Sequence, residues 1–322
     1  MKPQYQSDIY NLIKKYPQQF ELGFRIAEIV QITPSTQKFK EVIISTTSYN
    51  ATIAQSIKDL FSNIIDLPIT IHQDYDLPHT VGPDSLIIVV SLCGKREEML
   101  SAARMAYTQK AKIVTITTGG ELEVFARERA LPLILLDKTL PEFNPLTNGY
   151  MSGGCMVAIL IQILIKTKIL PVNIRQQVLA TEGVIEKMYL PKLGQKLAEL
   201  VTDTTLLIYS PAQYRGVTQL IKNLVNNLLQ SPCFYQLIPA VLHSEINSFQ
   251  SKSPTKYFTL ILNDTTLDNR LQKNILTLET KLTTLKIKSY NLELPGENQL
   301  EKTLASIMLI YWMIYWSLSQ QK

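Results

Sequence analysis

One segment of this sequence, residues 91–98 (SLCGKREE), combines residue types that suit phosphate binding. A hydroxyl group at Ser91 and the backbone N–H groups around Gly94 could hold a phosphate oxygen. Either Lys95 or Arg96 could add a positive charge beside it. The chemistry that this segment offers is therefore the binding of a small anion.

A second segment, residues 45–50 (STTSYN), places a run of hydroxyl groups directly before a predicted helix at 51–63. The first turn of a helix presents unpaired N–H groups and the positive end of the helix dipole, which also suits an anion. The alternative is that these Ser and Thr residues only cap the helix, as they do at many helix starts. The residue types alone leave both interpretations open.

Both segments follow predicted strands. Residues 85–91 (SLIIVVS) form a continuous apolar run, which is typical of a parallel strand covered on both faces. Further strands are predicted at 41–45, 69–72, 112–117 and 133–136, alternating with helices at 51–63, 96–109 and 120–129. This alternation predicts a doubly wound parallel α/β sheet, in which ligands bind at the carboxyl ends of the strands.

The second half of the chain repeats this rhythm less clearly. Its predicted strands are 205–209, 233–237, 257–263 and 284–290, with helices at 215–229, 268–283 and 299–318. The 322 residues are about twice the usual length of one domain. We therefore expect two domains, residues 1–166 with an N-terminal helix and residues 167–322 with connector helices and an apolar C-terminal helix.

The composition and charge of the chain exclude several classes of protein and of binding partner. Hydrophobic residues make up 46% and charged residues 18%, which excludes a disordered chain, a collagen-like repeat and a long coiled coil. The net charge of +5 comes from the second half of the chain but is not clustered into a Lys/Arg stripe, which favours a small anionic ligand over nucleic acid. Two apolar segments, 155–165 and 304–318, are too short to cross a membrane, so we expect buried helices and no membrane partner.

The three cysteines, Cys93, Cys155 and Cys233, lie far apart, and their odd number argues against a disulfide framework. Together with an N-terminus that lacks the pattern of a signal peptide, this predicts a cytoplasmic protein. No metal site is predicted, because the three histidines do not share metal-ligand spacing.

Four stretches resemble a known family: residues 72–78 (HQDYDLP), 84–98 (DSLIIVVSLCGKREE), 118–132 (TGGELEVFARERALP) and 237–246 (LIPAVLHSEI). The first three resemble the first sugar isomerase (SIS) domain of the bifunctional phosphoglucose/phosphomannose isomerases. The fourth resembles the ELPELNHNEI segment of that family. The resemblance covers about residues 15–318, and the chain is identified as a divergent member.

The resemblance implies two SIS domains of flavodoxin-like fold, flanked by helices, in a homodimer. It implies reversible isomerisation of glucose-6-phosphate or mannose-6-phosphate to fructose-6-phosphate, without a metal or organic cofactor. In the family a Ser/Thr-rich loop of the first domain binds phosphate, a His opens the sugar ring, and a Glu moves the proton between C1 and C2.

Position by position, the first domain departs from the family in its binding loops. Its SxSGxTEE phosphate loop retains Ser91 and Gly94, whereas Cys93 replaces a Ser and Arg96 replaces the Thr. With Lys95, these residues are the predicted phosphate contacts. The GMGGSA turn of the family corresponds roughly to residues 46–51, which assigns sugar or phosphate contacts to Thr47, Ser48 and Asn50.

The second domain departs at the general base. The KNQINEN helix of the family corresponds to residues 222–228, where Asn227 occupies the position of the Glu. An amide cannot accept the C2 proton, and loss of a general base costs about 10²–10⁴ in rate. His243 matches the ring-opening His, and Glu245 is the candidate for a substitute base.

Three hypotheses follow. In the first, the chain is a phosphohexose isomerase, that is, an intramolecular oxidoreductase, with a rearranged base. In the second, it is a non-catalytic phosphosugar-binding or regulatory SIS protein. The third hypothesis is a structural dimer in which the apolar C-terminal helix serves only association.

Overall fold

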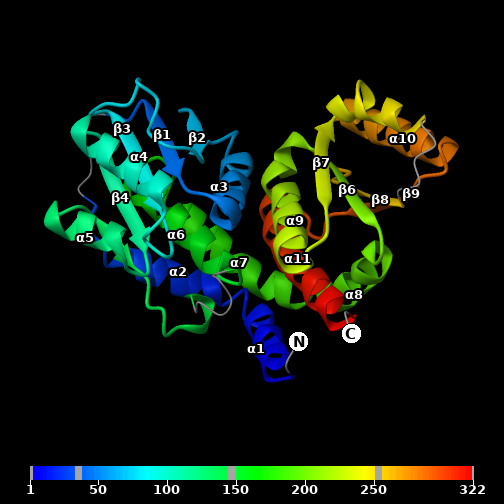
Figure 1. The fold of residues 1–322 in the computed structure, drawn as a ribbon, viewed down its shortest axis with the longest axis horizontal. Coiled ribbons are helices and arrows are strands. Elements are labelled where there is room, and N and C mark those ends of the chain that lie inside the picture. The colour runs from blue at the N-terminus through cyan, green and yellow to red at the C-terminus, as the bar shows by residue number, and fades with distance from the viewer. Residues whose placement is uncertain (1–2, 33–37, 144–149, 251–255, 321–322) are drawn as a thin grey trace. The chain divides into compact units, whose positions relative to one another are not determined.

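The computed structural model describes residues 3–32, 38–143, 150–250 and 256–320. The chain divides into two compact units. We call Lys14–Gly183 the N-terminal unit, and Met1–Ile13 together with Val184–Lys322 the C-terminal unit. Each contains one parallel β-sheet (Figure 1).

The N-terminal unit is built on a five-stranded sheet with the order β2-β1-β3-β4-β5. Its strands are β1 (Glu41–Ser45), β2 (Ile69–His72), β3 (Ser85–Val90), β4 (Lys112–Thr117) and β5 (Leu133–Leu135). The helices are α2 (Gln19–Glu28), α3 (Ser48–Leu60), α4 (Glu97–Thr108), α5 (Glu121–Glu128) and α6 (Gly153–Lys166). All strand pairs are parallel, which confirms the doubly wound sheet predicted for this half.

Both faces of this sheet are covered. One core joins inward side chains of β1 and β3, such as Ile43 and Val89, to Met99 of α4 and Leu122 of α5. Helices α3 and α6 pack together, as do α2 and α6. Every residue of β3 is buried, as expected for its continuous apolar run.

The C-terminal unit is built on a four-stranded sheet with the order β7-β6-β8-β9. Its strands are β6 (Thr205–Pro211), β7 (Cys233–Ile238), β8 (Tyr257–Asn263) and β9 (Lys288–Glu293), all paired in parallel. The helices are α1 (Pro3–Lys14), α8 (Leu190–Val201), α9 (Arg215–Leu228), α10 (Asn269–Thr284) and α11 (Gln299–Gln320). Helix α7 (Asn173–Glu186) carries the chain from one unit into the other.

Two apolar helices are almost wholly enclosed. Helix α6 is buried from Gly153 to Leu164, and α11 packs against α8 and α9. Within the same unit, the Tyr10 ring of α1 lies edge-on to Trp312 of α11, with ring centroids 5.0 Å apart. In the described part of the chain, no helix is long and apolar enough to cross a membrane.

One predicted strand is displaced. The strand expected at 284–290 begins only at Lys288, because α10 continues to Thr284. The helix then ends in a turn where Lys286 has a left-handed conformation (φ 57°). A residue of this conformation stops an α-helix, which moves the strand three or four residues along the chain.

Candidate functional site

The two binding segments predicted in the first half lie at one edge of the N-terminal sheet. Strands β1 and β3 are parallel neighbours, with Ser45 paired to Val89, so the segments that follow them leave the same edge. We call residues 46–50 and 91–96 the first-sheet edge. This is the edge at which parallel α/β sheets bind ligands.

Segment 91–96 is held by the turn that follows β4. Thr118 Oγ1 donates to the Leu92 carbonyl at 2.7 Å, and the Leu122 N–H donates to the Gly94 carbonyl at 3.0 Å. Gly94 has φ +64°, and a Cβ atom there would lie 1.7 Å from the Gly119 carbonyl oxygen. Packing against this turn therefore requires glycine at position 94, whatever the segment binds.

The polar side chains of this segment differ in exposure. Ser91 is buried, and its Oγ lies 4.0 Å from Sγ of the exposed Cys93. Lys95 and Arg96 are exposed, and within the described ranges neither forms an ion pair. Two unpaired cations therefore stand directly before α4, whose N-cap Arg96 makes no side-chain capping bond.

Segment 46–50 keeps a conformation that suits glycine although it contains none. Ser48 has φ 55°, and the resemblance aligns it roughly with a glycine of the GMGGSA turn. Thr47 stands at the N-cap of α3, but its side chain makes no capping hydrogen bond. Capping therefore does not account for the Thr47 hydroxyl.

Three side-chain atoms beside this segment are buried and have no hydrogen-bond partner among the described residues. They are Thr46 Oγ1, Asn50 Oδ1 and His72 Nε2. The Thr46 N–H donates to the His72 carbonyl at 2.9 Å, so these two residues are neighbours across β1 and β2. Buried polar atoms without a partner are costly, and at a ligand-binding edge they mark groups that a ligand can satisfy. We call these three residues the edge polar set.

The sequence pattern did not single out two members of the edge polar set. His72 reads as an ordinary strand-end residue, and Thr46 as one hydroxyl in a run. The parallel pairing that sets Ser45 opposite His72 is a long-range feature, so no local pattern could have linked them.

In the C-terminal unit, His243 and Glu245 lie after the carboxyl end of β7. His243 is exposed and follows a short 3-10 helix at Ala240–Leu242. Glu245 accepts a hydrogen bond at 2.9 Å from the hydroxyl of Tyr209, a fully buried residue of β6. Burial, with the neighbouring Glu245 charge, raises the pKa of Tyr209 well above its usual range, so it remains a donor. The Glu245 carboxylate is thereby fixed beside the sheet.

The structure does not bring Asn227 close to His243 within this unit. Asn227 is exposed in the last turn of α9, where its Nδ2 donates to the Asn223 carbonyl at 2.8 Å. The end of α9 lies near the amino ends of the strands, where Leu229 lines a cavity together with Thr205 and Lys256. The six residues of β7 span about 16 Å and separate that end from His243.

A buried ion pair lies at the carboxyl edge of the C-terminal sheet. Lys302 of α11 pairs with Asp264, and both side chains are at most 3% exposed. Tyr214 donates to Asp264 Oδ2 at 2.5 Å, and Thr266 Oγ1 donates to Oδ1 at 2.6 Å. Burial raises the pKa of Asp264, but the hydrogen bonds from Lys302, Thr266 and Tyr214 outweigh it and hold the pKa below its usual value. The sequence pattern gave no sign of this pair.

Within the described ranges, no group of three or more His, Cys, Asp or Glu side chains is placed to hold a metal ion.

The fold defines an α/β protein with two parallel-sheet units of the SIS type. Residues 192–318 match the model of the bacterial phospho-glucose isomerase C-terminal SIS domain. The chain is 26% identical over 255 residues to a bifunctional phosphoglucose/phosphomannose isomerase of Caldicellulosiruptor bescii, covering 76% of this chain and 71% of that protein. It is 23% identical over 248 residues to the protein of the same name in Aquifex aeolicus, covering 76% and 73%.

Among solved structures, tagatose-6-phosphate ketose/aldose isomerase from Escherichia coli shares the fold with a TM-score of 0.68 at 13% identity. The match covers 97% of this chain and 92% of that one. Over most of its length the chain is thus similar to bifunctional phosphoglucose/phosphomannose isomerases, and residues 192–318 are similar to a C-terminal SIS domain of bacterial phospho-glucose isomerases.

Proposed function

We propose that this chain binds a phosphorylated hexose at the first-sheet edge. The observation that carries the proposal is the edge polar set, three buried polar atoms without partners, next to two exposed cations without ion pairs. A phosphate fits Lys95, Arg96 and the first N–H groups of α4, because charged donors bind phosphate strongly. Sugar hydroxyl groups, which both donate and accept, fit Thr46, Asn50 and His72.

The reaction that we propose is the isomerisation of glucose-6-phosphate and mannose-6-phosphate to fructose-6-phosphate. By the family resemblance, His243 opens the sugar ring, and a neutral imidazole can move a proton near pH 7. Glu245 then transfers the proton between C1 and C2 in place of the base lost at Asn227. No metal or organic cofactor takes part.

A second candidate is a phosphosugar-binding protein without turnover. It is favoured by the hydrogen bond from Tyr209 to Glu245, since this bond occupies a lone pair of the carboxylate and fixes it beside the sheet. It is also favoured by the exposed amide at Asn227, which cannot accept a proton.

Binding is tested by titrating glucose-6-phosphate into the wild type and into a Thr46→Val variant. Loss of a hydrogen bond should weaken binding by about three- to tenfold. Thr259→Val is the matched control, because Thr259 is also fully buried with an unpartnered hydroxyl but lies within β8. Equal affinities of Thr46→Val and the wild type would remove the edge polar set from the site.

The two candidates are separated by exchange of the C2 hydrogen of glucose-6-phosphate in D₂O, followed by proton NMR. An isomerase using Glu245 loses about 10²-fold or more of its exchange rate in Glu245→Gln. A binding protein shows no exchange in the wild type although it binds the sugar.

A homodimer and a cytoplasmic setting complete the proposal. The first rests on the family resemblance and the second on the three separated cysteines. Sedimentation of the purified chain tests the dimer: a single species with the mass of one chain would contradict it.

A further inference from the structure

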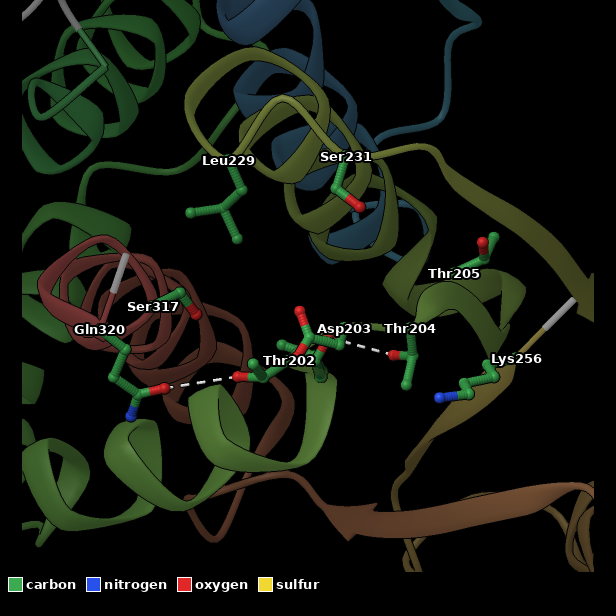
Figure 2. A pocket seen from close by; sticks show the side chains of 10 residues that line it. Thr202, Asp203, Thr204, Thr205, Leu229, Ser231, Lys256, Ser317 and Gln320 are labelled. Atoms are coloured by element: carbon green, nitrogen blue, oxygen red, sulfur yellow. Dashed lines mark hydrogen bonds between the residues drawn. The ribbon is translucent and has the colours of Figure 1, made fainter. Parts of the chain in front are cut away.

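The cavity lined by Leu229, Thr205 and Lys256 lies in the C-terminal unit, at the end of the sheet opposite the carboxyl edge (Figure 2). Its volume is about 660 Å³. It is lined by the segment between α8 and β6, the segment after α9, Lys256 directly before β8, and the last described turns of α11. The seven residues of β6 place it about 20 Å from the carboxyl ends of the strands.

The hydroxyl groups of two threonines can accept hydrogen bonds from a molecule in the cavity but cannot donate to it. Thr204 Oγ1 donates its hydrogen to the Val201 carbonyl at 3.0 Å. Thr202 Oγ1 lies 2.9 Å from the Ala198 carbonyl and 3.3 Å from Oε1 of Gln320, and its single hydrogen serves these acceptors. A hydroxyl whose hydrogen is already donated can only accept from a ligand.

Ser317 supplies an independent sign that a ligand completes this cavity. Its side chain lines the cavity from α11 and is only 8% exposed, yet its Oγ has no hydrogen-bond partner among the described residues. In Figure 2 the side chain extends from the helix toward the space that the labelled residues surround. An unpartnered buried hydroxyl is costly unless a bound molecule satisfies it.

The electrostatics of the cavity favour a cation. Two helices end at it, α8 at Val201 and α9 at Leu228. Each helix C-terminus carries roughly half a negative charge. The charges of Asp203 and Lys256 cancel, so the partial charges of the two helix ends remain.

We propose that this cavity binds a small protonated amine that carries hydroxyl groups. The ammonium group donates to Asp203 and to the lone pairs of Thr202 and Thr204. The hydroxyl groups of the ligand bond to Ser317 and to Ser231 on the other side of the cavity. Lys256, which is exposed, opposes the cation and sets an upper limit on affinity. This site is independent of the phosphohexose site.

The test is a calorimetric titration with glucosamine at pH 6.5, with glucose and N-acetylglucosamine as neutral counterparts. Glucosamine is expected to bind at least about tenfold more tightly than either neutral sugar. Asp203→Asn should weaken glucosamine binding by about tenfold, and Lys256→Gln should tighten it, since one removes the anion and the other the opposing cation. Equal affinity of glucosamine and glucose would overturn the proposal.

Ser317→Ala should weaken binding several-fold. The matched control is Ser306→Ala, because Ser306 is another buried serine of α11 with an unpartnered Oγ but does not line the cavity. Binding of inorganic phosphate that is lost in Lys256→Gln would assign the cavity to an anion and overturn the proposal. Thr46→Val should leave glucosamine binding unchanged, so failure at one site is distinguishable from failure at the other.

Discussion

The three cysteines differ in their exposure and in how strongly their surroundings disfavour the thiolate, the reactive form of the side chain. Cys93 is exposed in the first-sheet edge, beside Lys95 and Arg96. Burial raises the pKa of Cys233 to about 12 and that of Cys155 well above its usual range. The thiols of the two buried residues are therefore both inaccessible to a reagent and held in the unreactive protonated form.

We expect one thiol per native chain to react rapidly with a thiol reagent such as DTNB at pH 8. Cys93→Ser should remove this rapid phase, whereas Cys155 and Cys233 should react only after unfolding. Glucose-6-phosphate should slow the reaction of Cys93, because the phosphate would lie next to it. Two rapidly reacting thiols per native chain would contradict the burial of the other two.

Residue types alone were enough to propose part of the first-sheet edge as a binding site. Ser91, Gly94, Lys95 and Arg96 are adjacent in the sequence and follow one strand, so a local pattern could find them. His72 belongs to the same edge only because β2 pairs with β1. The sequence also could not show that packing requires glycine at position 94, since the contact is with a turn 25 residues away, at Gly119.

Helix–helix contact in the N-terminal unit depends on a glycine of α2. A Cβ atom at Gly23 would lie 2.4 Å from the Cys155 carbonyl oxygen of α6. Gly23→Ala should lower the free energy of unfolding by about 1–3 kcal/mol, the usual cost of overpacking a core. Gly183→Ala is the matched control in α7, where no atom lies within 4 Å of the added Cβ.

Urea unfolding of both variants checks this prediction. The control should be as stable as the wild type or gain about 0.5–1 kcal/mol, because alanine favours the helix. Equal stability of Gly23→Ala and the wild type would mean that α2 and α6 can move apart to accommodate the methyl group with no loss in the free energy of unfolding.

The buried pair of Lys302 and Asp264 ties α11 to the segment after β8. Without the Asp264 charge, the buried Lys302 retains only a longer contact at 3.6 Å to the half-exposed Glu293. Asp264→Asn should therefore cost about 3 kcal/mol at pH 7, the lower end of the usual cost of breaking a buried pair. The folded pKa of Asp264 is lowered, so its contribution is complete above the unfolded pKa of about 3.9 and is lost as pH falls through the folded value. The stability gap between wild type and Asp264→Asn should therefore narrow below pH 4.

Denaturant unfolding between pH 7 and pH 3 measures this gap. Because replacing both buried charges is much less costly than removing one, the double variant Asp264→Leu with Lys302→Met should be more stable than either single variant. A gap that stays constant from pH 7 to pH 3 would show that Asp264 has the same pKa in the folded and the unfolded protein, which would contradict the prediction.

Most helices and strands could be predicted because apolar residues recur at a regular spacing within each of them. Strands β1, β2, β4 and β8 have the predicted bounds, since short stretches rich in Val, Ile, Leu and Thr mark them clearly. Strand β9 was placed too early, because the end of α10 is set by a left-handed turn at Lys286 that apolar periodicity does not reveal. The ion pair of Lys302 was missed because Lys302 lies directly before the apolar part of α11.

At the scale of the whole molecule, the two sheets repeat one topology. The order β7-β6-β8-β9 repeats β2-β1-β3-β4, and the N-terminal sheet adds β5. This repetition agrees with two SIS units, as the family comparisons indicate. The departures at Cys93, Arg96 and Asn227 from the motifs of the similar family leave this strand order intact.

The central claim is that the first-sheet edge binds a phosphorylated hexose, and calorimetric titration at one ionic strength tests it most directly. The wild type should bind one glucose-6-phosphate per chain, at least about tenfold more tightly than glucose or inorganic phosphate. The double variant Lys95→Gln with Arg96→Gln should lose about ten- to a hundredfold in affinity, because charge-assisted hydrogen bonds to phosphate are removed. Binding that this double variant leaves unchanged, or no binding of glucose-6-phosphate at millimolar concentration, would contradict the claim.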